Sequence, residues 1–243
     1  MHTPLRLLAA ALIAASPLQG QQCPNGPVAL VLAGGGAKGF AHIGVLRALD
    51  SLGVRPDLVV GTSIGSIFGA LYASGFSGRQ IDSIVRTLPP PDVTGSFANR
   101  TPYDWGTLLP LLLWEQGRAG FSLVTRGVSE LRTDAALNRI LLRGNLLARG
   151  DFDRLPIPYR AVATDLRTRE AVTLKSGDLA QAVRASIAIP LVYTPERIGD
   201  RYFVDGGISA NVPIEAARGA GARRLIVVDL KDDSAQSDGA DMT

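Results

Sequence analysis

The sequence contains very little histidine and cysteine, and each shortage excludes a class of chemistry. Its 243 residues include two histidines, His2 and His42, and one cysteine, Cys23. A single cysteine cannot form a disulfide within the chain. Histidine and cysteine are also the usual zinc ligands, and no pair of acidic residues has a recognisable ligand spacing. We therefore expect no metal site.

The charge balance gives no indication of a nucleic-acid partner. The chain carries 25 Lys and Arg residues against 22 Asp and Glu residues, which gives a formal net charge of +3. Nucleic-acid binding depends on a basic patch, often with aromatic residues among the basic ones, and the sequence has no such cluster. The scattered arginines are typical of a solvated surface.

The first 22 residues have the layout of a secretory signal peptide. An early arginine precedes the uncharged apolar run LLAAALIAA at residues 7–15, and a small and polar stretch follows. The run is too short to span a bilayer, and an ordinary N-terminal helix is disfavoured because the stretch has no polar face. We expect export to the periplasm, to the outer membrane or cell surface, or to the medium.

Residues 23–230 are predicted to form one α/β domain, because short apolar runs alternate with stretches of helical periodicity. The 46% of hydrophobic residues suffices for a sizeable core. This alternation is typical of a parallel sheet with right-handed crossovers, so we predict a three-layer α/β/α sandwich with a mostly parallel central sheet. The expected strands are 28–33, 57–60, 159–166, 171–174, 201–204 and a buried last strand 224–229. The expected helices are 40–52, 64–74, 77–88, 128–142, 178–187 and 211–218.

Three segments stand outside this alternation. Residues 89–106 are rich in proline and polar residues, which predicts a loop. The apolar stretch 108–114 (LLPLLLW) is predicted to be a buried or lid-like helix, or a segment that enters a lipid interface, a boundary that tryptophan favours. The polar, acidic tail 231–243 is expected to be disordered.

The most informative motif is the pentapeptide GTSIG at residues 61–65, a G-x-S-x-G that follows an expected strand. In such a motif a sharp turn exposes the serine hydroxyl as a nucleophile. Gly61 and Gly65 are expected to allow the strained turn and to keep side chains away from an incoming acyl group. A Ser-His-Asp hydrolase of this fold class has its histidine late in the chain, whereas His42 precedes Ser63. If Ser63 is catalytic, a group other than histidine activates it, and we expect a structural role for His42.

A glycine-rich loop, GGGAKG at residues 34–39, follows the first expected strand. It satisfies G-x-G-x-x-G through Gly34, Gly36 and Gly39, but no acidic residue ends the second strand to hold a ribose. A P-loop is excluded because Gly39 follows Lys38 where Ser or Thr is required. A plain turn before a helix remains open. The alternative is that backbone N–H groups of Gly35 and its neighbours, assisted by the helix dipole and Lys38, stabilise a developing oxyanion.

The third motif is Asp205-Gly206-Gly207, at the end of the expected strand 201–204. An Asp before two glycines is usually a turn former. In a chain without a suitable histidine, however, a carboxylate within hydrogen-bond distance of Ser63 can accept its proton. The unperturbed pKa of Asp is about 3.9, so this role requires burial or neighbours that raise its basicity.

Together the three motifs resemble those of the patatin-like phospholipase family. In that family they are the oxyanion loop, the nucleophile elbow and the second member of a Ser–Asp dyad. The resemblance covers about residues 26–230 and includes RASIAIP at residues 184–190. The segment 151–165 is similar to bacterial patatin domains, including those of secreted autotransporter lipases. Such domains usually continue beyond the last strand, whereas this sequence stops at Thr243.

The resemblance implies that Ser63 is the nucleophile and Asp205 its base. It implies hydrolysis of a phospholipid or another acyl-ester lipid through an acyl-serine, with no cofactor and with peripheral contact to a membrane surface. Transfer of the acyl group to an acceptor other than water remains an alternative, as does a secreted lipid-binding protein with a vestigial active site. The implied oxyanion residues are Gly34, Gly35, Gly36, Lys38 and Gly39, and the implied turn glycines are Gly61, Gly65, Gly206 and Gly207.

Overall fold

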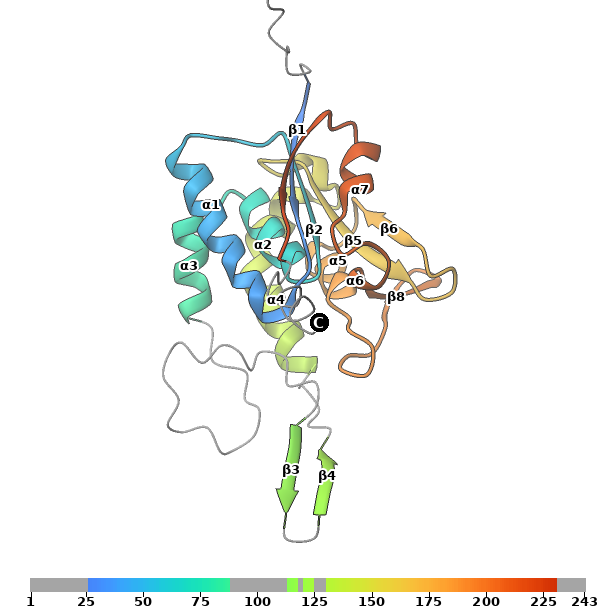
Figure 1. Ribbon diagram of the computed structural model, residues 1–243. Helices are drawn as coiled ribbons and strands as arrows, with labels where there is room; N and C mark the ends of the chain where they lie inside the picture. The colour runs from blue at the N-terminus through green and yellow to red at the C-terminus, as the bar shows by residue number, and fades with distance from the viewer. Residues whose placement is uncertain (1–25, 88–112, 118–119, 125–129, 231–243) are drawn as a thin grey trace, which may run out of the picture.

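A computed structural model of the chain describes residues 26–87, 113–117, 120–124 and 130–230 (Figure 1). Three expectations lie outside these ranges: the signal peptide 1–22, the loop 89–106 and the tail 231–243. No helix among the described residues combines the length and the apolar character needed to cross a bilayer.

The main sheet has a parallel centre and an antiparallel edge. Within the described residues it holds seven strands, in the spatial order β7-β8-β5-β2-β1-β9 with β6 also paired to β5. Strands β9, β1, β2 and β5 pair in parallel, whereas β6 and β8 run antiparallel to β5, and β7 antiparallel to β8. The strands are β1 (Val28–Leu32), β2 (Leu58–Thr62), β5 (Tyr159–Asp165), β6 (Ala171–Leu174), β7 (Glu196–Ile198), β8 (Arg201–Asp205) and β9 (Arg224–Val228).

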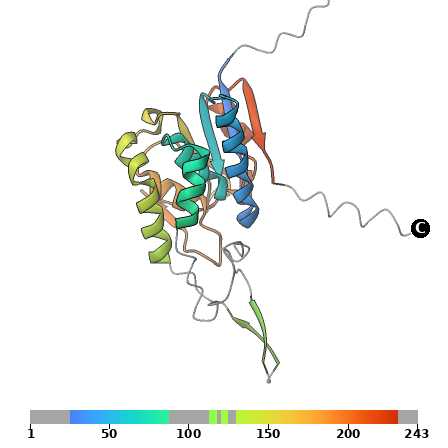
Figure 2. The same cartoon turned by 90° about the vertical axis from the view of Figure 1, so that its left-hand side faces the viewer.

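Helices cover both faces of this sheet, which gives the predicted three layers. Figures 1 and 2 show α1 and α3 on one side of the strands, and Figure 1 shows α7 on the other. Alternate residues of β1 serve the two faces: Leu30 and Leu32 belong to the core under α1–α5, whereas Ala29 and Val31 belong to the core under α7. The helices are α1 (Ala41–Ser51), α2 (Ile64–Ala73), α3 (Gly78–Thr87), α4 (Glu130–Ala148), α5 (Leu179–Ser186), α6 (Gly207–Ala210) and α7 (Ile214–Gly219).

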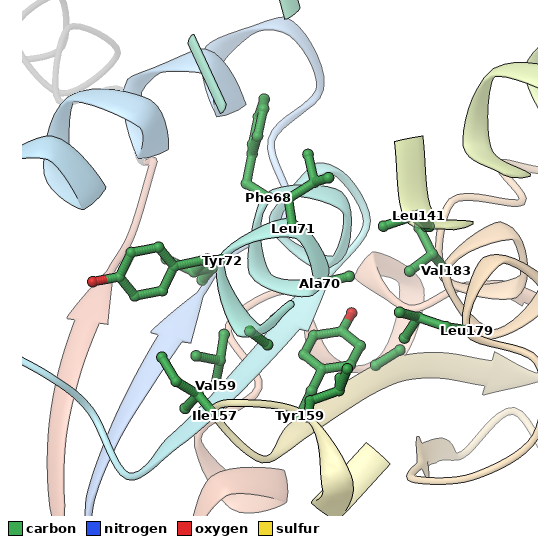
Figure 3. Packing of buried hydrophobic residues seen from close by; sticks show 14 of the residues in the cluster. Val59, Phe68, Ala70, Leu71, Tyr72, Leu141, Ile157, Tyr159, Leu179 and Val183 are labelled. Atoms are coloured by element: carbon green, nitrogen blue, oxygen red, sulfur yellow. The ribbon is translucent and has the colours of Figure 1, made fainter. Parts of the chain in front are cut away.

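The larger core surrounds α2, which begins directly after the G-x-S-x-G serine. Figure 3 shows Phe68 and Leu71 of this helix packed among apolar side chains. Tyr159 of β5 is fully buried beneath the helix, and its hydroxyl donates a hydrogen bond of 2.9 Å to the Ser66 carbonyl oxygen. This packing fixes the first turn of α2 against the centre of the sheet.

Two helix predictions were wrong at their ends. Helix α4 extends to Ala148 rather than 142, because it continues through Gly144. A Cβ on Gly144 would overlap the Ser74 and Leu179 side chains, so this glycine allows close packing of the helix. The predicted helix 211–218 begins at Ile214, because Pro213 occupies its N-cap position.

Two strand-level predictions also need correction. The last strand, β9, lies at the sheet edge, where Val227 is exposed, and so is not fully buried as predicted. Leu113 and Trp114 belong to β3 (Leu113–Gly117), which pairs antiparallel with β4 (Gly120–Val124), and not to a helix. Periodicity alone does not distinguish helix from strand in a short apolar run. The remainder of the stretch, 108–112, lies outside the described residues.

Candidate active site

Ser63 occupies the sharp turn between β2 and α2. Its backbone has φ +52° and ψ −126°, a strained conformation for a residue with a side chain, which costs on the order of 1–3 kcal/mol. The first turn of α2 holds it in place, since the N–H and hydroxyl of Ser66 both donate to the Ser63 carbonyl oxygen, at 2.8 and 2.6 Å. The strand–turn–helix geometry expected of the motif is therefore present.

The two glycines of the motif are required for close packing rather than for an unusual backbone conformation. Neither Gly61 nor Gly65 has a positive φ; the strained residue is Ser63 itself. A Cβ on Gly61 would overlap the carbonyl of Gly65, and a Cβ on Gly65 would overlap the carbonyls of Leu32 and Ala33. These glycines allow the strained turn by leaving room for neighbouring backbone, while the strained residue is Ser63.

We expect Gly65→Ala to lower the free energy of unfolding by about 1–3 kcal/mol, because the new methyl group is forced against two backbone carbonyls that cannot rotate away. Urea denaturation monitored by circular dichroism measures this change. Gly44→Ala on α1 is the matched control, since a Cβ there has nothing within 4 Å and should stabilise the exposed helix by about 0.5–1 kcal/mol. Equal unfolding midpoints for the two variants would contradict the packing argument.

Asp205 lies at the end of β8 and contacts Ser63 directly. The Ser63 hydroxyl donates a hydrogen bond of 2.7 Å to Asp205 Oδ2, and the Gly207 N–H donates one of 2.6 Å to Asp205 Oδ1. Strand β5 brings the two residues together, because Thr62 pairs with Val162 while Asp205 pairs with the next residue of β5 on its other side. The side chains that the sequence suggested as a pair thus meet in the fold.

The surroundings of Asp205 favour its neutral form. Ser63 and Asp205 are only 8% and 6% exposed. Burial raises the pKa of the Asp205 carboxyl, while the hydrogen bonds from Ser63 and Gly207 partly oppose that rise. A carboxylate with a raised pKa is a stronger base than an exposed Asp, which is the property that proton transfer from a serine requires.

The glycine-rich loop packs against this elbow. After β1 the backbone is extended at Gly35 (φ 170°) and left-handed at Gly36 (φ +53°), a conformation that favours glycine, and it then enters a short 3₁₀ turn over Gly36–Phe40. A Cβ on Gly34 would lie 3.2 Å from the Ser63 Cβ, and one on Gly39 would overlap the Ile64 side chain. The loop therefore lies directly beside the serine.

Hydrogen bonds determine which N–H groups of the loop are already engaged. The Gly34 N–H donates to the Asn211 carbonyl oxygen at 3.0 Å, and the Lys38 N–H donates to the Gly35 carbonyl oxygen at 3.2 Å. The Asn211 side-chain amide also donates to the Gly34 carbonyl oxygen, at 3.3 Å. The N–H groups of Gly35 and Gly36, at the start of this 3₁₀ turn, donate none of the hydrogen bonds described for the loop, which makes them suitable donors for an oxyanion.

The two glycines after Asp205 also lie in tight surroundings. A Cβ on Gly206 would overlap the carbonyl of Val162, and one on Gly207 would lie 2.9 Å from Asp205 Oδ1. The D-G-G sequence therefore lets the chain turn into α6 without displacing the carboxylate or β5.

His42 has the structural role expected for it. It is fully buried, and its Nε2 lies 2.8 Å from the Ala33 carbonyl oxygen, to which it donates. Burial lowers its pKa, which keeps the ring neutral. Among the residues whose positions are described, no group of three or more His, Cys, Asp or Glu side chains is arranged to hold a metal ion.

Sequence reasoning missed two buried hydroxyls beside the pair. The Ser186 Oγ accepts a hydrogen bond of 2.9 Å from the Ser63 N–H, and the Thr164 hydroxyl donates one of 2.9 Å to the Asp205 carbonyl oxygen. Ser186 lies in RASIAIP, which contributed to the family resemblance but gave no sign of a contact with Ser63. A buried serine has no periodic signature, so only the family block could have drawn attention to it.

Comparisons with known proteins agree with the resemblance that the sequence motifs indicated. A family model described as "Patatin-like phospholipase" matches residues 30–218. An uncharacterized NTE family protein of Mycobacterium tuberculosis is 34% identical over 217 residues, which cover 89% of this chain and 52% of that protein. The human patatin-like phospholipase domain-containing protein 6 is 33% identical over 205 residues, covering 84% of this chain and 13% of that protein. The chain thus spans about half the length of the first of these relatives, and far less of the second.

Two solved structures are also similar. VipD from Legionella pneumophila has a TM-score of 0.44 at 18% identity, covering 78% of this chain and 47% of VipD. The type III effector protein ExoU has a TM-score of 0.42 at 19% identity, covering 72% of this chain and 43% of ExoU.

Proposed function

The chain belongs to the patatin-like phospholipase family, and we propose that it hydrolyses the acyl ester of a phospholipid or a related lipid with a Ser63–Asp205 dyad. The observation that carries the proposal is the hydrogen bond of 2.7 Å from the Ser63 hydroxyl to the buried Asp205 carboxylate. Membership in a family of lipid hydrolases supports the substrate class.

In the first half of the proposed reaction, Asp205 accepts the proton of the Ser63 hydroxyl as Oγ attacks the ester carbonyl carbon. In this proposal the N–H groups of Gly35 and Gly36, in the loop that packs against the elbow, stabilise the resulting oxyanion. The tetrahedral intermediate collapses, the protonated Asp205 gives its proton to the leaving alcohol oxygen, and an acyl-serine remains.

In the second half, a water molecule takes the place of the alcohol. Asp205 removes a proton from this water, whose oxygen attacks the acyl-serine carbonyl carbon. The same N–H groups stabilise the second oxyanion, and collapse releases the fatty acid as the proton returns to Ser63 Oγ. One carboxylate therefore acts as base and acid in both halves, which requires a pKa above that of an exposed Asp.

The purified chain incubated with phosphatidylcholine vesicles in H₂¹⁸O tests the proposal. We expect release of fatty acid and lysolipid in equal amounts, with one ¹⁸O atom in the fatty-acid carboxyl group, as measured by mass spectrometry. Acyl esters formed with added alcohols or lysolipids, in place of labelled fatty acid, would instead support an acyltransferase. Vesicle binding with unchanged lipid after prolonged incubation would contradict the proposal and support a lipid-binding protein.

A further inference from the structure

Ser186, the last residue of α5, bonds the backbone of Ser63 and that of Gly206, the residue after Asp205. It is fully buried. Its Oγ accepts the N–H of Ser63 at 2.9 Å and donates to the Val162 carbonyl oxygen at 2.6 Å, while its own carbonyl oxygen accepts the N–H of Gly206 at 3.2 Å. One residue thus links the elbow, β5 and the residue that follows Asp205.

The hydrogen bond to Ser63 acts where the backbone is strained. Ser63 has φ +52°, a conformation that persists only where the surrounding structure holds it. Its N–H is buried, and the Ser186 hydroxyl is its partner. Without that hydroxyl, this buried donor and the Val162 carbonyl would each lose a hydrogen bond, which favours relaxation of the turn.

The end of α5 also holds the end of β8. A helix leaves its last carbonyl groups without partners inside the helix. Here the Ser186 carbonyl accepts the Gly206 N–H, and the carbonyl of Ala188, just beyond the helix, accepts the Asp205 N–H at 2.9 Å. The segment 186–188 therefore fixes the backbone from which the Asp205 carboxylate projects.

Contacts of a second residue hold helix α5 in place. Arg184, a buried residue two positions before Ser186, donates to Asp134 of α4 at 2.9 Å, and its guanidinium lies over the Tyr193 ring at 4.6 Å. Because α5 is held against α4 and the following loop, its last residue is a fixed point for the two reactive groups rather than a mobile neighbour.

We propose that Ser186 is a positioning residue that sets the distance between Ser63 Oγ and Asp205, an inference that rests on the proposed hydrolase function. It takes no part in bond making. Its hydroxyl maintains the strained turn of Ser63, and its carbonyl oxygen holds Gly206, the residue after Asp205. The nucleophile and the proton acceptor therefore stay within the distance that proton transfer requires.

Ser186→Ala tests this role. We expect kcat for fatty-acid release to fall by about 10–100-fold, because displacement of a reacting group by about 1 Å costs rates of this order. KM should change less than about twofold, since no substrate contact is removed. The hydrogen bond from Ser63 lowers the pKa of Asp205, so its weakening should also move the acid limb of the pH–kcat/KM profile to higher pH.

Ser74→Ala is the matched control. Ser74 is an equally buried serine, at the other end of α2, and its hydroxyl donates to the Ala70 carbonyl of its own helix. This variant should keep the wild-type kcat and pH profile even if its unfolding temperature falls. Should Ser186→Ala fail to fold, Ser186→Cys retains the volume and a weak donor and acceptor, and an intermediate kcat is expected.

The results of these measurements distinguish a failure of the positioning role of Ser186 from a failure of the proposed hydrolase function. Wild-type kcat and an unmoved acid limb in Ser186→Ala, or equal losses in Ser186→Ala and Ser74→Ala, would overturn the positioning role while the proposed function stood. A folded wild-type chain that releases no fatty acid would overturn the proposed function, and the role of Ser186 with it.

Discussion

Ser63→Ala should lower kcat for lipid hydrolysis by about 10⁴–10⁶-fold, the range observed when the nucleophile of a serine hydrolase is removed. The substitution deletes the only atom of Ser63 that bonds to Asp205, and leaves the carboxylate with the Gly207 N–H as its remaining described donor. The Cβ remains, so the elbow keeps its shape. Fatty-acid release from vesicles measures the loss.

Covalent labelling gives a second measurement that does not depend on the choice of lipid. A fluorescent phosphonate that mimics an acyl ester should label the wild type and Ser74→Ala equally, and should not label Ser63→Ala. The buried serine control excludes a general effect of losing a hydroxyl from α2. Full labelling and full hydrolysis in a folded Ser63→Ala variant would show that another residue is the nucleophile.

The residues of this site could be predicted from the sequence, but their meeting could not. The elbow is local: an apolar run, a glycine, a serine and a second largely apolar segment follow one another along the chain and define β2, the turn and α2. Asp205 reaches Ser63 only because β8 pairs antiparallel with β5 and ends opposite Ala163, the residue after the partner of Thr62. Alternating strands and helices predict parallel neighbours, so this pairing runs against the local pattern.

The antiparallel edge of the sheet also could not be predicted from local sequence. Strand β7 is three residues long, with two charged residues among them, and carries no apolar alternation that would distinguish it from a turn. Strand β7 forms because it can pair with the edge of β8, and that edge is present only once the sheet has assembled. The contacts of Ser186 are equally non-local, since its partner Ser63 lies 123 residues earlier in the chain.

Asp205→Asn should lower kcat/KM by about 10²–10⁴-fold, the usual contribution of a positioned general base. An amide of the same shape can still accept the Gly207 N–H and can donate to the Ser63 hydroxyl, so the geometry is expected to survive while proton transfer is lost. Phosphonate labelling and fatty-acid release both report this change. The wild-type kcat/KM should fall on acidification with a midpoint above the ordinary Asp range, because burial raises the pKa of Asp205.

The same variant should be more stable than the wild type at neutral pH. A carboxyl whose pKa is raised in the folded protein contributes its full stability below the unfolded-state pKa, near 3.9, and loses that contribution as the pH rises through its folded-state value. At pH 7 the wild type therefore carries the cost of a buried charge that the amide avoids. The unfolding temperature of Asp205→Asn should exceed that of the wild type at pH 7, and the difference should disappear below about pH 4. An Asp205→Asn variant less stable than the wild type at pH 7 would show that the Ser63 and Gly207 hydrogen bonds outweigh burial, and would remove the argument that Asp205 is a strengthened base.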